Sequence, residues 1–250
     1  MDRIIYTAMS GAQQSMDQQA IIANNLANAS TPGFRAQLQA LRAVPVQGEG
    51  LPTRSVVAVT TPGSDFTPGP ITTTGNELDV AISGEGWLAV QAANGEAYTR
   101  RGDLQIDANG VLTSMGRPVV GDNGPIVVPL GAQVSIGSDG TLSALIPGGE
   151  PVTRGPIGQL KLVTPGPGGL IRGDDGLFRP GPNANGVAPA VLPADETVRV
   201  ISGALEGSNV SITQTMVAMI DSARRYDMQM KTIESADENA QRANNLLSMS

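Results

Sequence analysis

The chain of 250 residues contains neither cysteine nor histidine. Without cysteine it has no disulfide, no thiolate nucleophile and no iron–sulfur cluster. Without histidine it has no Ser-His-Asp triad and no imidazole ligand for a metal. Any acid–base chemistry would have to come from carboxylates, lysine or tyrosine. Composition alone therefore excludes many classes of enzyme.

Basic residues are also scarce: the chain has 16 lysines and arginines but 23 aspartates and glutamates, which gives a net charge of −7. Nucleic-acid binding needs a basic patch, so we expect no nucleic-acid partner. No window holds the roughly 18 consecutive apolar residues of a membrane span, and polar residues interrupt the N-terminal segment too early for a cleavable signal peptide. We expect either a cytoplasmic protein or one exported by a route that reads no such signal.

Both ends of the chain have the periodicity of helices. Residues 3–29 lack proline and carry a small, alanine-rich apolar stripe, and residues 30–33 (Ser-Thr-Pro-Gly) predict the end of that helix. A helix with so little apolar surface needs a partner to be stable. The stripe consists of Ile5, Met9, Ala12, Met16, Ala20, Ala23 and Ala27.

The clearest periodicity is a 4-3 repeat of apolar residues near the C-terminus, the pattern of a coiled-coil seam. It predicts a long helix that begins after Ser211, with Gln214 at capping-box spacing. Its methionines belong either to a packed seam, which we favour, or to an adaptable binding face. Three acid–base pairs at i,i+4 support the helix: Asp221–Arg225, Asp227–Lys231 and Glu238–Arg242. The seam positions are Ile212, Met216, Met219, Ala223, Tyr226, Met230, Ile233, Asp237, Ala240, Asn244 and Leu247.

Between the ends the apolar period is two, as expected of β-strands, and glycine and proline concentrate here. The alternation is seen in Val56/Ala58/Thr60, Leu78/Val80/Ile82 and Leu160/Leu162/Thr164. Turn sequences at 107–110, 138–140 and 174–176 predict hairpins. Residues 106–112 recur in similar form at 136–142, which indicates two similar hairpins.

Aspartates in this middle part are the obvious source of a possible active or calcium site. A pair of carboxylates would suit glycoside hydrolysis, but aspartate beside glycine is typical of tight turns, and we interpret them so. No calcium-loop or P-loop motif is present, and Trp87 lies in an alternating strand pattern that favours a core position. We therefore predict no catalytic residue, no cofactor and no metal. The aspartates are Asp103, Asp107, Asp122, Asp139, Asp174, Asp175 and Asp195.

Three asparagines, Asn24, Asn25 and Asn28, lie near the end of the first predicted helix. Asparagine is a mediocre helix former, so these amides either bond to another chain or an adjoining turn, or belong to an elaborate helix stop. Spacing alone does not decide between the two.

At this run the sequence resembles a known family. Residues 24–34 (NNLANASTPGF) resemble the N-terminal signature of the bacterial flagellar rod and hook proteins, and residues 205–210 (LEGSNV) resemble their C-terminal signature. Residues 86–90 (GWLAV) and 98–112 (YTRRGDLQIDANGVL) look like the central motif of that family. Within it, the length and the opening residues resemble the proximal rod proteins, with the distal rod proteins as the alternative.

The resemblance implies a structural subunit of the basal-body rod in the periplasm, which serves motility and is not an enzyme. It implies an α+β fold in which N- and C-terminal helices pair as a coiled coil, with a central antiparallel β-rich domain. The predicted segments are 1–35 (N-terminal helix), 36–77 (extended connector), 78–204 (β-rich domain) and 205–250 (C-terminal coiled-coil helix). A carboxylate-based peptidoglycan hydrolase and a secreted β-rich adhesin are the alternatives from other functional classes.

The partners that the resemblance implies are other copies of the chain, neighbouring rod proteins including the distal rod, and the flagellar type III export apparatus. Helices poor in apolar surface would stay unfolded for export and gain their packing on assembly, after which the rod transmits torque. The candidate assembly interface comprises Asn24, Asn25, Leu26, Asn28, Phe34, Leu205, Asn209, Ile212, Met216, Met219, Ala223, Tyr226, Met230, Ile233, Ala240 and Leu247.

Overall fold

The computed structural model divides the chain into two compact units. The first comprises Met1–Ala29, Ala36–Asp65 and Val210–Ser250, and the second comprises Ser30–Arg35 and Phe66–Asn209. The structure describes residues 2–45, 55–60, 63–145, 155–166, 169–182 and 186–248.

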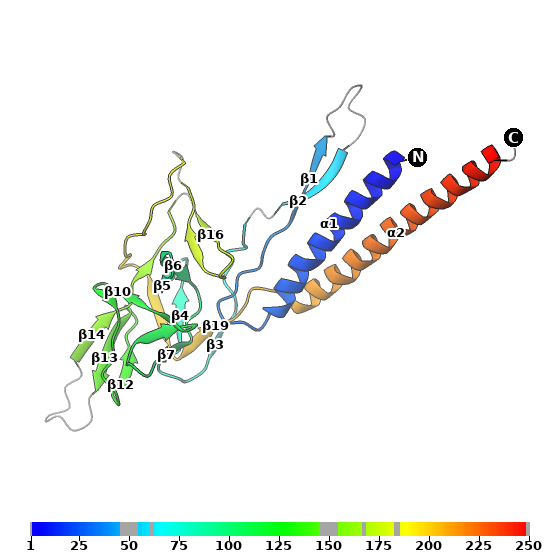
Figure 1. Ribbon diagram of the computed structural model, residues 1–250. Coiled ribbons are helices and arrows are strands. Elements are labelled where there is room, and N and C mark those ends of the chain that lie inside the picture. The colour runs from blue at the N-terminus through cyan, green and yellow to red at the C-terminus, as the bar shows by residue number, and fades with distance from the viewer. Residues whose placement is uncertain are drawn as a thin grey trace. The chain divides into compact units, whose positions relative to one another are not determined.

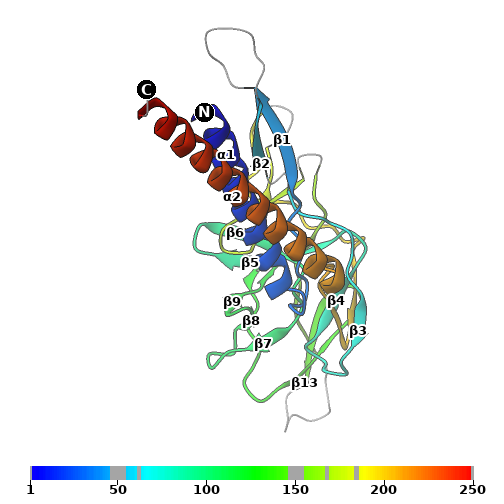
Figure 2. The ribbon, with the colours of Figure 1, turned by 90° about the vertical axis from the view of Figure 1, so that its right-hand side faces the viewer.

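Two antiparallel helices form most of the first unit (Figures 1 and 2). Helix α1 spans Asp2–Ala27 and helix α2 spans Ile212–Ser248, and both chain termini lie at the same end of the pair. A hairpin of β1 (Ala40–Pro45) and β2 (Ser55–Thr60) lies beside α1. The two predicted helices and their packing against each other are thus confirmed, and the hairpin lies within the segment predicted as an extended connector.

Small residues allow the two helices to approach closely. The Ser222 hydroxyl, buried in α2, donates a hydrogen bond of 3.0 Å to the main-chain oxygen of Ser15 in α1. A Cβ atom on Gly11 would lie 3.0 Å from the end of the Gln229 side chain, so a larger residue at this position of α1 would require that side chain to shift.

The face that α1 buries is only partly the predicted apolar stripe. Ala12 of that stripe is buried, but Met9 and Met16 remain 59% and 57% exposed. The helix buries instead a face of mostly small side chains, because these permit the close approach to α2. Within residues 5–27 of α1, the buried positions are Ala8, Ala12, Ser15 and Ile22.

The local helix signals are present in α2 but weak. The main-chain N–H of Thr215 donates to the Ser211 oxygen at 2.9 Å, whereas Gln214 N lies 3.5 Å from the Ser211 hydroxyl, at the limit of a hydrogen bond. Of the three predicted acid–base pairs, all in the described part of α2, Glu238–Arg242 forms an exposed ion pair at 3.2 Å. Such a pair adds only a few tenths of a kcal/mol, about 0.3–0.5.

The second unit consists of antiparallel strands. Its largest sheet has five strands in the order β15–β5–β6–β17–β16. These are β5 (Trp87–Ala92), β6 (Gly95–Thr99), β15 (Leu162–Val163), β16 (Leu170–Arg172) and β17 (Phe178–Pro180). Two three-stranded sheets are formed by β7 (Leu104–Ile106), β8 (Leu112–Ser114) and β9 (Arg117–Pro118), and by β12 (Gln133–Ile136), β13 (Thr141–Leu145) and β14 (Gly155–Gln159). Three strand pairs complete the unit: β3 (Ile71–Thr73) with β19 (Ala204–Glu206), β4 (Val80–Ser83) with β18 (Arg199–Ser202), and β10 (Val120–Gly121) with β11 (Gly124–Pro125).

Strand β5 separates two hydrophobic clusters. Its period of two sends Leu88 and Val90 into a large aliphatic cluster and Trp87 and Ala89 into a smaller, partly aromatic one. Both faces of this strand are therefore buried, and Trp87 is 3% exposed. The core position predicted for Trp87 is confirmed.

Three hairpin turns of the second unit share one geometry, and all three were predicted. In each, a main-chain N–H donates to the oxygen four residues later over 2.8–2.9 Å, and a glycine has a φ of 77–82°. An aspartate in each turn accepts a hydrogen bond from a main-chain N–H, which confirms the structural interpretation of Asp107, Asp139 and Asp175. The main-chain N–H of Thr141, followed by its hydroxyl, lowers the pKa of Asp139. The turns join β7 to β8, β12 to β13 and β16 to β17.

Two of these turns allow a matched test. Gly110 and Gly176 have nearly the same φ, 81° and 77°, but a Cβ on Gly110 would lie 2.5 Å from the Val128 oxygen while one on Gly176 would meet nothing within 4 Å. We expect Gly176→Ala to lower the free energy of unfolding by about 1–2 kcal/mol because of the left-handed backbone alone. Gly110→Ala should lower it by a further 1–3 kcal/mol or so because of the clash. Urea unfolding followed by Trp87 fluorescence measures both, and equal losses would contradict the packing at Gly110.

Candidate assembly interface

The predicted seam of α2 is covered unevenly. Of its candidate residues, Met219, Tyr226, Ile233 and Ala240 are half-buried. The residues that alternate with them along the seam are exposed: Met216, Ala223 and Met230. Ile212, which shares the heptad position of the half-buried residues, is also exposed at the start of the helix. Leu247 lies in α2, but its side chain is outside the described residues. The structure therefore covers one edge of the seam and leaves the other open.

The asparagine run has different environments at its three positions. The Asn25 side chain exchanges two hydrogen bonds with the main chain of Gln37: its amide nitrogen donates at 3.0 Å and its oxygen accepts at 2.9 Å. Asn28 donates to the main-chain oxygen of Asn24 at 2.9 Å, and the Asn24 side chain is exposed. Asn25 thus bonds to an adjoining segment of its own chain, and the neighbouring Leu26 is half-buried.

Phe34 lies inside the second unit, at 8% exposure. The segment 30–35 is attached to strand β19 and the residues that follow it. Gly33 N donates to the Glu206 oxygen at 2.7 Å, and Asn209 N donates to the Phe34 oxygen at 3.3 Å. The Asn209 side chain donates to the main-chain oxygen of Thr67 at 3.1 Å, and the half-buried Leu205 pairs with β3. The N- and C-terminal signature runs are therefore joined here.

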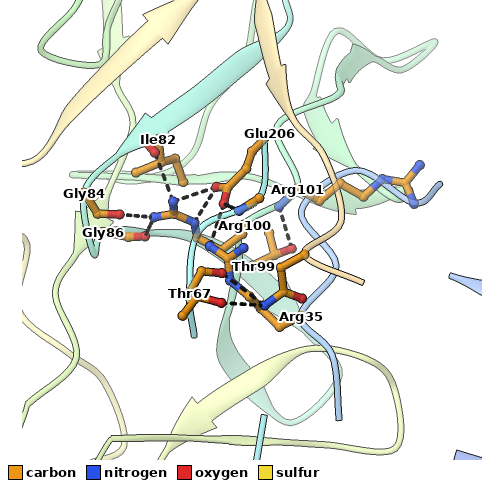
Figure 3. A network of polar contacts seen from close by, with 11 residues as sticks. Arg35, Thr67, Ile82, Gly84, Gly86, Thr99, Arg100, Arg101 and Glu206 are labelled. Carbon is orange, nitrogen blue, oxygen red and sulfur yellow. Dashed lines mark hydrogen bonds and ion pairs between the residues drawn. The ribbon is translucent and has the colours of Figure 1, made fainter. Parts of the chain in front are cut away.

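A buried charge cluster lies at this junction, with Glu206 at its centre (Figure 3). Oε1 of Glu206 lies 2.6 Å from Nη2 of Arg35 and accepts a 2.9 Å hydrogen bond from the N–H of Gly69. Oε2 lies 2.6 Å from Nη2 of Arg100 and accepts from its Nε at 2.8 Å. Glu206, Arg35 and Arg100 are each 2% exposed. Such short, charge-assisted contacts are needed to offset the cost of burying charges.

Arg100 also ties the cluster to the sheet. It donates to the main-chain oxygens of Ile82 at 3.0 Å and Gly84 at 2.9 Å, and to that of Gly86. Burial lowers the pKa of Arg100, the carboxylate of Glu206 opposes this shift, and the charge of Arg35 adds to it. The neighbouring Arg101 points away from the cluster (Figure 3) and pairs with Asp103.

Sequence analysis missed this cluster, although each member lies in or next to a quoted motif. Arg35 follows Phe34, Arg100 is in the central motif, and Glu206 is the only acid of the run at 205–210. The available signal was the single acidic residue of the run at 205–210. That signal does not identify the partners, because Arg100 and Glu206 are 106 residues apart.

None of the helices in the described part of the chain is long and apolar enough to cross a membrane. The described residues also bring together no group of three or more side chains that could hold a metal ion.

Three family models match successive parts of the chain. "Flagella basal body rod protein" matches residues 5–35, "Flagellar hook protein FlgE/F/G D1 domain" matches 81–144, and "Flagellar basal body rod FlgEFG protein C-terminal" matches 201–246. The chain is 57% identical to the flagellar basal-body rod protein FlgF of Escherichia coli K12 and 56% identical to that of Salmonella typhimurium, over the full length of each chain. It is 32% identical to the flagellar basal-body rod protein FlgG of Bacillus subtilis, over 98% of this chain and 99% of that one.

The chain therefore belongs to the family of flagellar basal-body rod proteins. It is a structural subunit of the rod and not an enzyme, and it assembles with other rod proteins. Its greater identity to the two FlgF proteins than to this FlgG protein places it in the proximal rod, as the sequence predicted.

Removing the negative charge of Glu206 should lower the free energy of unfolding by a large amount. Glu206→Gln keeps the shape but leaves two buried arginines without a counter-charge, and we expect the free energy of unfolding to fall by about 3–5 kcal/mol. The control is Glu77→Gln, an exposed glutamate of the same unit, which should change it by less than about 0.5 kcal/mol. Urea unfolding followed by Trp87 fluorescence compares the two, and similar small losses would show that Glu206 does not hold the unit together.

Proposed function

We propose that the chain polymerises with copies of itself and with neighbouring rod proteins, including the distal rod, through coiled-coil contacts of its terminal helices. The half-covered seam of α2 is the observation that carries this proposal. A seam needs side chains of a facing helix on both of its edges, and α1 supplies them on one. Met216 and Met230, on the open edge, are 50% and 43% exposed.

Helix α1 also presents apolar side chains that its own unit does not cover. Tyr6 is 72% exposed, and Met9 and Met16 are more than half exposed. Clusters of exposed apolar side chains mark interaction sites. Helices of adjacent subunits would bury these residues together with the open edge of α2, and the exposed Asn24 would bond across the same contact.

The helix pair is too lightly packed to be stable by itself. Among residues 212–246 of α2, Ser222 is the only fully buried side chain, and among residues 5–27 of α1 three of the four buried residues are alanine or serine. Such a pair gains little from hydrophobic burial. We infer that it is unfolded when the flagellar type III apparatus exports the chain and that it orders on docking into the rod.

Within this proposal, residues 1–35 and 205–250 form the rod core, residues 36–77 connect, and residues 78–204 form the outward-facing β-rich domain. Heterologous contacts between identical subunits propagate as a helix. A continuous core of packed helices then carries torque along the rod, while the buried clusters of the second unit keep that unit rigid.

Hydrogen exchange tests the order of folding. In the soluble monomer, we expect amides of α1 and α2 to exchange rapidly while those of β4, β5 and β6 are protected, because only the second unit has a substantial core. In assembled rods the amides of both helices should become protected. Protection throughout both helices in the monomer would contradict folding on assembly.

Single substitutions on α2 test the seam. A lysine at Met216 or Met230 would place a charge in the proposed contact, so Met216→Lys and Met230→Lys should abolish rod assembly and swimming. Met228→Lys is the matched control, because Met228 is 59% exposed but lies off the seam. Swimming in soft agar and the yield of purified basal bodies measure the effect, with immunoblots of exported protein to check secretion. A Met228 variant as defective as the other two would contradict the seam.

A further inference from the structure

Helix α1 carries two lines of residues with the 4-3 spacing of a coiled-coil seam. The first line contains the four buried positions of α1, and its Ser15 accepts the hydrogen bond from Ser222 of α2. The second line, the open line of α1, is exposed at every position: Tyr6, Met9, Gln13, Met16, Ala20, Ala23 and Ala27. Since a facing helix is what fills such a line, α1 has a place for a second helix besides its own α2.

Helix α2 exposes an apolar line as well. This open line of α2 consists of Ile212, Met216, Ile220, Ala223 and Met230. Beyond Met230, every exposed residue from Lys231 to Asn245 is polar. The open line of α2 is therefore confined to the first half of the helix.

The two open lines lie at the same level of the antiparallel helix pair (Figure 1). The hydrogen bond between the two serines fixes that level. Tyr6 lies nine residues before the serine of α1, and Met230 lies eight residues after the serine of α2. At the other end, Ala27 lies twelve residues after the first serine and Ile212 ten residues before the second. Each line is thus about 30 Å long, since a helix rises 1.5 Å per residue.

The side chains on the two lines are complementary in size. From Ala20 to Ala27 the open line of α1 consists of alanines, and at this level α2 exposes the larger Ile212 and Met216. Large and small residues on facing helices interdigitate well. The alanines therefore leave room for the large side chains that an α2 helix does not bury against its own α1.

The charges beside the two lines are complementary too. Asp17 is exposed one turn after Gln13 of the open line of α1, and Arg224 is exposed one turn after Ile220 of the open line of α2. Neither forms an ion pair within the described part of the chain. Each lies two residues after one of the hydrogen-bonded serines. Since both charges lie on equivalent flanks, an antiparallel contact between the two lines brings them to the same side.

We propose that the open line of α1 packs against the open line of α2 in a second copy of the chain. The contact is antiparallel, its register lies within about one helical turn of that between α1 and α2 in one subunit, and Asp17 pairs with Arg224 across it. This inference rests on the proposed function and deepens it by naming the partner helix and the register. Each subunit offers two different lines, so the contact is heterologous and can propagate.

Cysteine cross-linking tests the partner helix. The chain has no cysteine of its own, so tagged copies with Ala20→Cys and untagged copies with Ile220→Cys, produced in one cell, can form a mixed disulfide only between subunits. We expect this heterodimer in mildly oxidised, purified basal bodies, because a disulfide needs Cα atoms within about 4–7 Å of each other. Leu246→Cys is the control for Ile220→Cys: Leu246 is exposed on α2 but lies roughly 39 Å further along it. It should give at least roughly tenfold less heterodimer.

Two results of this experiment would overturn the inference. The first is assembled basal bodies that contain no heterodimer of Ala20→Cys with Ile220→Cys. The second is an equally strong disulfide between two Ala20→Cys copies, because it would show that the open line of α1 meets another α1.

An exchange of charges tests the register. Asp17→Arg or Arg224→Asp alone would bring like charges together, so each should lower the yield of basal bodies by roughly threefold or more. The two changes combined should restore the yield. Asp17→Arg with Arg225→Asp is the control, because Arg225 is also exposed but successive helix positions face different sides. Failure of Arg224→Asp to restore the yield, or equal restoration by Arg225→Asp, would overturn the ion pair.

This inference and the proposed function can fail separately. If Met216→Lys and Met230→Lys abolish assembly while Ala20→Cys forms no heterodimer with Ile220→Cys, this inference fails and the proposed function stands. If both lysine variants assemble normally, the proposed function fails instead. Immunoblots of exported protein confirm in every case that secretion is intact.

Discussion

The carboxylate of Glu206 is the contact on which the second unit depends. It joins three segments that are far apart in the sequence, because Arg35 follows α1, Arg100 directly follows β6, and Glu206 ends β19 shortly before α2. A buried charge without its partner is far more costly than an exposed one. These three segments therefore have to pack against one another cooperatively. Two of them, at Arg35 and Glu206, lie in the sequence just after α1 and just before α2.

Features encoded locally were predictable from the sequence. The turns around Gly110, Gly140 and Gly176 follow from aspartate and glycine within a few residues, and the helix bounds follow from apolar spacing and from the residues at 30–33. The charge cluster was not predictable in this way, because neither Arg100 nor Glu206 has a local pattern that names the other. The same holds for Asn25, whose partner Gln37 lies beyond the helix end.

The predicted seam of α2 lies between features that the local sequence encodes and contacts that it does not. Its 4-3 spacing included one set of residues that is half-buried, Met219, Tyr226, Ile233 and Ala240, and another that is exposed, Met216, Ala223 and Met230. Small residues occupy the contact instead: Ser15 and Ser222 are buried, and the Ser222 hydroxyl donates to the main-chain oxygen of Ser15. Small residues contribute little to a hydrophobic pattern, so periodicity favours the larger Met9 and Met16, which the structure leaves exposed.

Exposed apolar side chains on both helices leave the isolated subunit incomplete. Met9 and Met16 on α1, and Met216 and Met230 on α2, remain exposed to solvent and gain little from hydrophobic burial within one chain. In a polymer, helices of neighbouring subunits would cover these side chains, so the surface that contributes little to the stability of the monomer would drive assembly. The buried charge cluster differs from this surface, because Glu206 is paired with Arg35 and Arg100 within a single chain. It can therefore hold the second unit together before any neighbour docks.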